Sequence, residues 1–360
     1  MSLTIKRVAI LGAGPGGLAE AALLSKHGYD VHLFNGSSNR IEAISKVGGV
    51  TIEGDFGEEF VRIGKITTDI EEALFDRQLV FSFTPANGQR QMAELAAPFL
   101  KKGGVFLYAS GSAGSLEAYP IFSQQGIDVI DDVLLGETLT LPQSARVTGP
   151  TKVLIKFPWQ TRMAAFPAKN NDRLYEVMEG VLDFRYSPNV LDTGINNENF
   201  IIHPGPMLLN YAASERADGK LSLMSEGMTK GVLRCVDQID SEKMALQEAL
   251  GLQPISIDSL YAELGSSPGI YREPGENFGI KDRIWKRYIT EDVPYGTVLF
   301  SSLGKLLDVA TPVSDAINIL LSVVEKTDFY AEGRTVEKLG LAGLSVDEIG
   351  YFLQHGVYQS

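Results

Sequence analysis

The stretch that decides the fold is Arg7-Val8-Ala9-Ile10-Leu11-Gly12-Ala13-Gly14-Pro15-Gly16-Gly17. It predicts a buried strand over residues 7–12 and a helix over residues 16–27. Gly12, Gly14 and Gly17 have the G-x-G-x-x-G spacing, in which the glycines permit a tight turn, close approach to a pyrophosphate and close helix–strand packing. The helix N-terminus adds N–H donors for an anion. This end of the chain is therefore predicted to bind a dinucleotide.

Strand and helix patterns alternate outward from this turn. We expect further strands over 31–34, 79–83 and 105–109, helices over 40–47 and 89–100, and a hairpin insert over 49–63. This order is typical of an α/β fold, and it predicts a doubly wound Rossmann domain with a mostly parallel sheet over residues 1–193. Helical periodicity dominates afterwards, with helices expected over 240–250, 257–264 and 313–326. Residues 194–360 are therefore predicted to form an all-α domain that holds the substrate and catalytic residues.

Composition limits the class of protein. The chain has 360 residues, 44% of them hydrophobic and 21% charged, which is typical of a soluble globular protein. Its single cysteine, Cys235, excludes an intrachain disulfide and a thiol-based metal cluster, and no secretory signal is evident, so we expect a cytoplasmic protein without a bound metal. A net charge of -13 argues against nucleic-acid and acidic-membrane partners, which leaves small molecules as the expected partners.

The end of the second strand bears on the choice of nicotinamide cofactor. NAD sites usually place an acid there, whereas this strand ends at Asn35. Asn35, Ser37 and Arg40 offer hydrogen bonds and positive charge to a 2′-phosphate, so NADP is favoured and NAD is the alternative. Thr84 and Pro85 follow another strand at the carboxyl edge of the sheet, where ligands bind in such folds, and they are further candidates for cofactor contact.

Proton-transfer chemistry is suggested by His203, one of four histidines. Pro204 disfavours helical dihedrals at the preceding residue, so His203 is expected at a helix start or kink. Further along, Arg287 and Asp292 place a cation and a carboxylate in one short segment. Histidine, arginine and a carboxylate suit proton transfer beside an anionic substrate. Glu291 is expected to point away from Asp292, as adjacent residues do in an extended segment, and is given no catalytic role.

With these residues in view, the chain resembles the opine dehydrogenases of the octopine/nopaline dehydrogenase family, most closely the bacterial N-(1-carboxyethyl)-norvaline dehydrogenase type. The motifs that carry the resemblance are the glycine turn, Gly136-Glu137-Thr138 with Arg146 downstream, Asn197-x-Asn199-x-x-x-His203-Pro204-x-Pro206, Arg287-Tyr288-x-x-Glu291-Asp292-Val293 and the segment 332–341. The resemblance implies an NAD(P)H-dependent oxidoreductase that joins the amine of an amino acid to a 2-oxo acid. It also implies that His203 is the acid/base, that Asp292 orients and charges it, and that Arg287 binds a substrate carboxylate.

Two other functions remain open at this point. One is reduction of a 2-oxo acid without an amine, as in 2-dehydropantoate 2-reductases, although that family relies on a lysine as the acid and this chain has His203 where the lysine is expected. The other is a non-catalytic NADP-binding sensor. The residues that would select the amino acid are candidates only, namely Met207, Tyr211, Tyr261, Tyr271 and Trp285. An apolar face on the helical part would favour a homodimer.

Overall fold

The computed structural model describes residues 5–218, 220–273 and 286–359. The chain divides into two compact units, one of residues 1–194 with 351–360 and one of residues 195–350. The predicted domains were 1–193 and 194–360, so the final ten residues group with the first unit rather than the second. Two helices span the divisions, α7 (Val190–Ile195) and α18 (Val346–His355). No helix in the described part of the chain is long and apolar enough to cross a membrane.

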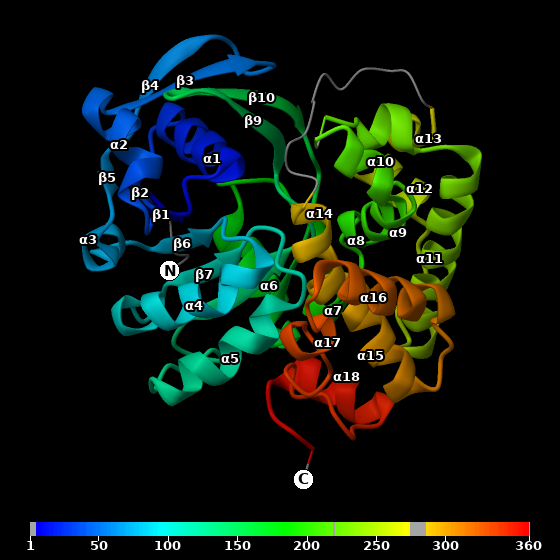
Figure 1. Cartoon of the computed structure of the whole chain (residues 1–360). Helices are drawn as coiled ribbons and strands as arrows, with labels where there is room; N and C mark the ends of the chain where they lie inside the picture. Colours follow the sequence, from blue (N-terminus) through cyan, green and yellow to red (C-terminus); the bar gives the residue numbers. More distant parts are fainter. Residues whose placement is uncertain (1–4, 219, 274–285, 360) are drawn as a thin grey trace. The chain divides into compact units, whose positions relative to one another are not determined.

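The first unit contains two sheets (Figure 1). The larger has the strand order β12-β11-β8-β7-β6-β1-β2-β5, and every ladder is parallel except that between β8 and β11. Its strands are β1 (Arg7–Leu11), β2 (Asp30–Phe34), β5 (Lys65–Thr67), β6 (Leu79–Ser82), β7 (Val105–Tyr108), β8 (Leu134–Thr138), β11 (Arg162–Phe166) and β12 (Arg185–Tyr186). The predicted doubly wound, mostly parallel plan is confirmed.

The smaller sheet has the order β4-β3-β10-β9. Its strands are β3 (Gly49–Gly54), β4 (Glu59–Arg62), β9 (Gln143–Gly149) and β10 (Lys152–Pro158). The expected hairpin is β3 with β4, and β10 joins it in parallel to β3 while pairing antiparallel with β9. The sequence analysis did not predict this completion of the sheet, because β9 and β10 lie far downstream of the hairpin.

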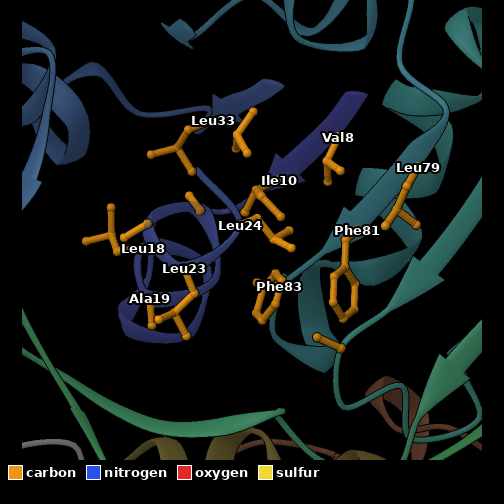
Figure 2. Packing of buried hydrophobic residues seen from close by; sticks show 14 of the residues in the cluster. Val8, Ile10, Leu18, Ala19, Leu23, Leu24, Leu33, Leu79, Phe81 and Phe83 are labelled. Carbon is orange, nitrogen blue, oxygen red and sulfur yellow. The ribbon is translucent and has the colours of Figure 1, made fainter. Parts of the chain in front are cut away.

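Helices complete the first unit. They are α1 (Pro15–Lys26), α2 (Ser38–Val47), α3 (Ile70–Leu74), α4 (Ala86–Ala96), α5 (Gly114–Gln124) and α6 (Asn171–Met178), with short 3₁₀ turns at Ala97–Phe99 and Ala168–Asn170. Apolar side chains of β1, β6 and α1 form the core between them, among them Ile10, Leu24 and Phe81 (Figure 2). This core anchors the strand, turn and helix that contain the glycine motif.

Helix α1 is enclosed by both sheets. It contacts β1 and β2 of the larger sheet and all four strands of the smaller one, and every residue from Gly16 to Leu24 is buried. The enclosure includes Glu20, whose Oε2 accepts a hydrogen bond from Gln143 at 3.1 Å. Burial raises the pKa of Glu20 to about 7, although the hydrogen bond from Gln143 opposes the shift.

All elements in the described part of the second unit are helical, which confirms the predicted all-α architecture. They are α8 (Asn199–Ile202), α9 (Pro204–Leu209), α10 (Tyr211–Arg216), α11 (Lys230–Ala249), α12 (Ile257–Glu263), α13 (Gly269–Arg272), α14 (Arg287–Thr290), α15 (Val298–Leu307), α16 (Pro312–Glu325) and α17 (Phe329–Glu332). π-Helical turns occur at Leu223–Gly227 (η3) and Val293–Thr297 (η4). The predicted helix over 240–250 is the second half of α11, whose start is capped by Thr229.

Candidate active site

The glycine turn between β1 and α1 has the shape that a pyrophosphate requires. Gly12 has a φ of +108°, and a Cβ atom there would lie 3.1 Å from the carbonyl oxygen of Phe83. A Cβ on Gly17 would lie 1.8 Å from the carbonyl oxygen of Gly12, so no larger residue fits. Gly14 is the opposite case, with nothing within 4 Å of an added Cβ at the N-terminus of α1. The three glycines therefore fit the predicted dinucleotide, with open space where its phosphates would approach.

Asn35 ties the end of β2 to this turn. Its Oδ1 accepts from the Ala13 backbone N–H at 3.0 Å, and its Nδ2 donates to the carbonyl of Ser37 at 3.1 Å. The amide expected to face a 2′-phosphate thus holds the loop through its own hydrogen bonds. Ser37 and Arg40 are both exposed at the start of α2, and Arg40 forms no ion pair with any other described residue.

The other predicted cofactor contacts lie at the carboxyl end of β6, which adjoins β1 in the sheet. Thr84 is half-buried, and its hydroxyl lies 3.0 Å from that of Ser82. Pro85 is exposed and immediately precedes α4. The backbone of this segment lies beside the glycine turn, since a Cβ on Gly12 would be 3.6 Å from the Thr84 nitrogen.

A constrained loop follows β7 at the same edge of the sheet. Ser110, Ser112 and Ala113 all have positive φ, at 62°, 55° and 64°, a conformation that costs non-glycine residues free energy. The carboxylate of Glu137 stabilises it by accepting from the backbone N–H groups of Ala113 at 2.8 Å and Ser115 at 2.9 Å. Sequence reasoning quoted Glu137 within a motif but gave it no role, because its partners come from a distant loop.

His203 lies in the second unit, between the end of α8 and the start of α9. The expectation that Pro204 marks a helix start here is confirmed, although the φ of −107° and ψ of −57° of His203 stay in the helical region. The backbone continues through the break, because the His203 N–H donates to Asn199 and its carbonyl accepts from Met207. The imidazole is therefore held at a junction of two short helices.

The imidazole is bound on two sides by one helical segment. Its Nδ1 lies 2.7 Å from Oδ2 of Asp292, and both side chains are buried. The ring of Tyr288 stacks on it with centroids 3.7 Å apart and planes inclined by 17°. Sequence reasoning gave roles to His203 and Asp292 but quoted Tyr288 only within a motif and gave it none. The signal for its role is the helical spacing of four residues between Tyr288 and Asp292.

The electrostatics of the pair favour retention of one proton. Burial raises the pKa of the Asp292 carboxyl well above its usual range, the neighbouring charge of Glu291 raises it further, and Arg287 opposes the shift. A buried histidine–carboxylate pair without a proton carries a net negative charge, which burial disfavours. The geometry and burial therefore favour a pair that holds one proton between its two groups.

Arg287 is half-exposed at the start of α14, where its Nε forms an ion pair with Glu291. The sequence analysis placed Glu291 in an extended segment, with its side chain pointing away from Asp292. That was wrong, since Arg287–Thr290 is helical and the spacing of four residues brings Arg287 and Glu291 together. Arg287 therefore lies on the same segment as Tyr288 and Asp292, with a carboxylate already beside it.

The predicted selectivity residues have different environments. Met207, Tyr261 and Tyr271 are buried, and the Tyr271 hydroxyl bonds to Asp258. The half-buried Tyr211 donates to Glu325 at 2.8 Å. Trp285 lies outside the described residues. In the first unit, Arg146 is half-buried on β9 and donates to the carbonyl of Ala145.

A chain that combines a turn shaped for a dinucleotide with a buried histidine–carboxylate pair belongs, by class, to the NAD(P)-dependent oxidoreductases. Residues 186–324 match the family model described as NAD/NADP octopine/nopaline dehydrogenase, alpha-helical domain, and residues 8–120 match ketopantoate reductase PanE/ApbA. An opine dehydrogenase of Arthrobacter sp. (strain 1C) is 32% identical over 350 residues, 94% of this chain and 96% of that protein. The chain belongs to the opine dehydrogenase family.

Solved structures share the fold. Octopine dehydrogenase with NADH and L-arginine has a TM-score of 0.72 and 18% identity, covering 98% of this chain and 99% of that one. Yersinopine dehydrogenase with NADP+ bound has a TM-score of 0.67 and 16% identity, covering 98% of each chain. The resemblance inferred from the motifs is confirmed, and a nicotinamide dinucleotide is the cofactor of this family.

Proposed function

We propose that His203 and Asp292 carry out the proton transfers of an opine dehydrogenase reaction, the NAD(P)H-dependent joining of an amino acid amine to a 2-oxo acid. The observation that carries this proposal is the buried hydrogen bond between Nδ1 of His203 and Oδ2 of Asp292 at 2.7 Å. A histidine oriented by a carboxylate is a suitable general acid and base near neutral pH.

In the proposed mechanism, the amine attacks the carbonyl carbon of the 2-oxo acid to give a carbinolamine, and acid-assisted loss of water gives a protonated imine. Water loss needs a proton on the departing oxygen, which His203 supplies from Nε2 while Nδ1 stays bonded to Asp292. The reduced nicotinamide supplies a hydride to the imine carbon when it is bound. Gly12, Gly14 and Gly17 would hold its pyrophosphate at the start of α1.

A substrate screen tests this proposal. NADPH and NADH oxidation is measured with pyruvate and with 2-oxoglutarate, each with and without a panel of amino acids. Oxidation that requires both an amino acid and a 2-oxo acid supports the proposal. Oxidation by the 2-oxo acid alone supports ketopantoate-type reduction, the second candidate, which the match of residues 8–120 favours. Cofactor binding without oxidation would indicate a sensor.

We propose NADP as the preferred cofactor, supported by the exposed Ser37 and Arg40 and by the absence of an acid at Asn35. Asn35 contributes by holding the loop, and the phosphate donors are then Ser37 and Arg40. Thr84 and Pro85 are proposed to contact the cofactor from β6. A homodimer stays a prediction, supported by aliphatic side chains exposed on α16, which are Ile319, Leu320, Val323 and Val324.

Replacing Arg40 by alanine is expected to weaken NADPH binding about tenfold and to leave NADH binding nearly unchanged, because only NADPH has a phosphate for the guanidinium to bind. Fluorescence titration with each cofactor measures the two dissociation constants. Arg173→Ala, at an exposed position on α6, is the matched control and should change neither. Equal losses for both cofactors would contradict the assignment.

Replacing Arg287 by lysine is expected to raise the KM for the 2-oxo acid about tenfold or more, with little change in cofactor affinity. Lysine keeps the charge but loses the planar fork that binds a carboxylate through two hydrogen bonds. Initial-rate kinetics at varied 2-oxo acid measure the effect. Arg216→Lys, exposed on α10, is the control. An unchanged KM would mean that Arg287 serves only its ion pair with Glu291.

A further inference from the structure

Tyr288 and Asp292 hold one imidazole from two directions. They are four residues apart on consecutive helical turns, so both side chains extend from the same side of the segment. Asp292 bonds to the edge of the His203 ring at Nδ1, and Tyr288 covers one of its faces. A hydrogen bond at one atom leaves the ring able to rotate about that bond, whereas a stacked ring at 3.7 Å and 17° fixes its plane.

We propose that Tyr288 is a positioning residue that fixes the plane of the His203 imidazole and favours its protonated form. This inference rests on the proposed role of His203 as the general acid. The face of an aromatic ring carries partial negative charge, so a cation stacked on it is stabilised relative to the neutral form. Both neighbours thus stabilise protonated His203. Asp292 does so through the hydrogen bond at the ring edge, and Tyr288 does so through the ring face.

Other groups near the pair bear on its ionisation. Glu291 and Arg287 act on the charge of Asp292 from the same segment. Tyr261 of α12 interacts electrostatically with Tyr288 and with Glu198, the residue before α8. From α11, Cys235 lies against Gly205, two residues after His203. Tyr288, by contrast, stacks on the face of the imidazole. Its effect on the ionisation of His203 therefore differs in kind from the effects of these charges.

The test compares two substitutions that keep an apolar side chain at position 288, one with an aromatic ring and one without. Tyr288→Phe retains the ring and should leave the titration of His203 within a few tenths of a pH unit of the original protein. Tyr288→Leu loses the ring and should move that titration to lower pH by about half a unit. NMR of histidine-labelled protein measures it, with the His203 signal assigned by its loss in His203→Gln. Reductive kcat at pH 7.5 should fall in Tyr288→Leu at unchanged cofactor affinity, and Tyr288→Phe should retain it.

The NMR readout needs no substrate, so it separates this inference from the proposed reaction. A His203 titration that is the same in Tyr288→Leu as in the original protein would overturn the role of the stack. A loss of ordered structure in Tyr288→Leu is recognised by far-UV circular dichroism, because the other three histidines lie in the first unit. The titration of Tyr288→Met then replaces that of Tyr288→Leu as the deciding measurement. If the substrate screen fails but the titration moves as expected, the proposed reaction is wrong and the stack stands.

Discussion

Replacing His203 by glutamine is expected to lower the rate of reductive condensation by on the order of 10²–10⁴-fold, the range for loss of a general acid/base. Glutamine can still donate a hydrogen bond to Asp292, so the buried carboxylate keeps a partner. The substitution therefore does not destabilise the fold by leaving a buried charge unpaired. Its amide cannot release a proton near neutral pH. The loss should therefore fall on turnover and leave cofactor binding intact.

Single-turnover kinetics and fluorescence titration with NADPH separate these two effects. His27→Gln is the matched control, because His27 is exposed at the end of α1 in the other unit. Near-normal turnover in His203→Gln would mean that His203 is an ordinary buried histidine without a role in proton transfer. A parallel loss of cofactor binding would also count against the assignment, since the glycine turn belongs to the first unit.

Replacing Asp292 by asparagine is expected to slow both directions on the order of 10²-fold and to move the ionisation that controls them to lower pH by about one unit or more. The carboxylate compensates the charge of a protonated imidazole inside the protein, and asparagine does not. A buried imidazolium without that charge loses its proton more readily. Forward condensation should therefore fail at a lower pH than in the original enzyme.

The sign of the pH effect follows from which form each direction needs. Condensation uses protonated His203 and declines as pH rises through the ionisation of the pair, whereas oxidation of the opine uses the neutral form and rises through it. One shared ionisation should thus appear in both profiles, and Asp292→Asn should shift both toward acid. Profiles that keep their midpoints in Asp292→Asn would contradict the proposed coupling between Asp292 and His203.

The parts of the fold with strong local signals were predictable from the sequence. The glycine turn lies between a strand and a helix as expected, and Gly12 and Gly17 have the steric constraints that the spacing implies. Pro204 correctly placed His203 at a helix start. The pairing of His203 with Asp292, 89 residues apart, came from the resemblance of the motifs rather than from periodicity, because no local pattern encodes so distant a contact.

Features that depend on distant chain segments or on local helix geometry were missed. The residues around Glu291 were interpreted as extended, although a helical turn there joins Arg287 to Glu291 and places Tyr288 against His203. Four residues are too few to establish a helical period in the sequence. Helix α1 was predicted, but its enclosure on both sides was not, because the strands β9 and β10 that cover its second side give no signal near residues 16–27.

The enclosure of α1 constrains how such an enzyme evolves. Between Gly16 and Leu24 every substitution alters a packed interior, where even small changes of volume cost about 1 kcal/mol or more. Substitutions at the exposed positions after β2 cost little stability by comparison, and these positions are Ser37, Asn39 and Arg40. If Ser37 and Arg40 bind the cofactor as proposed, a few surface substitutions would change the choice of nicotinamide at little cost in stability, whereas substitutions within α1 would destabilise the first unit.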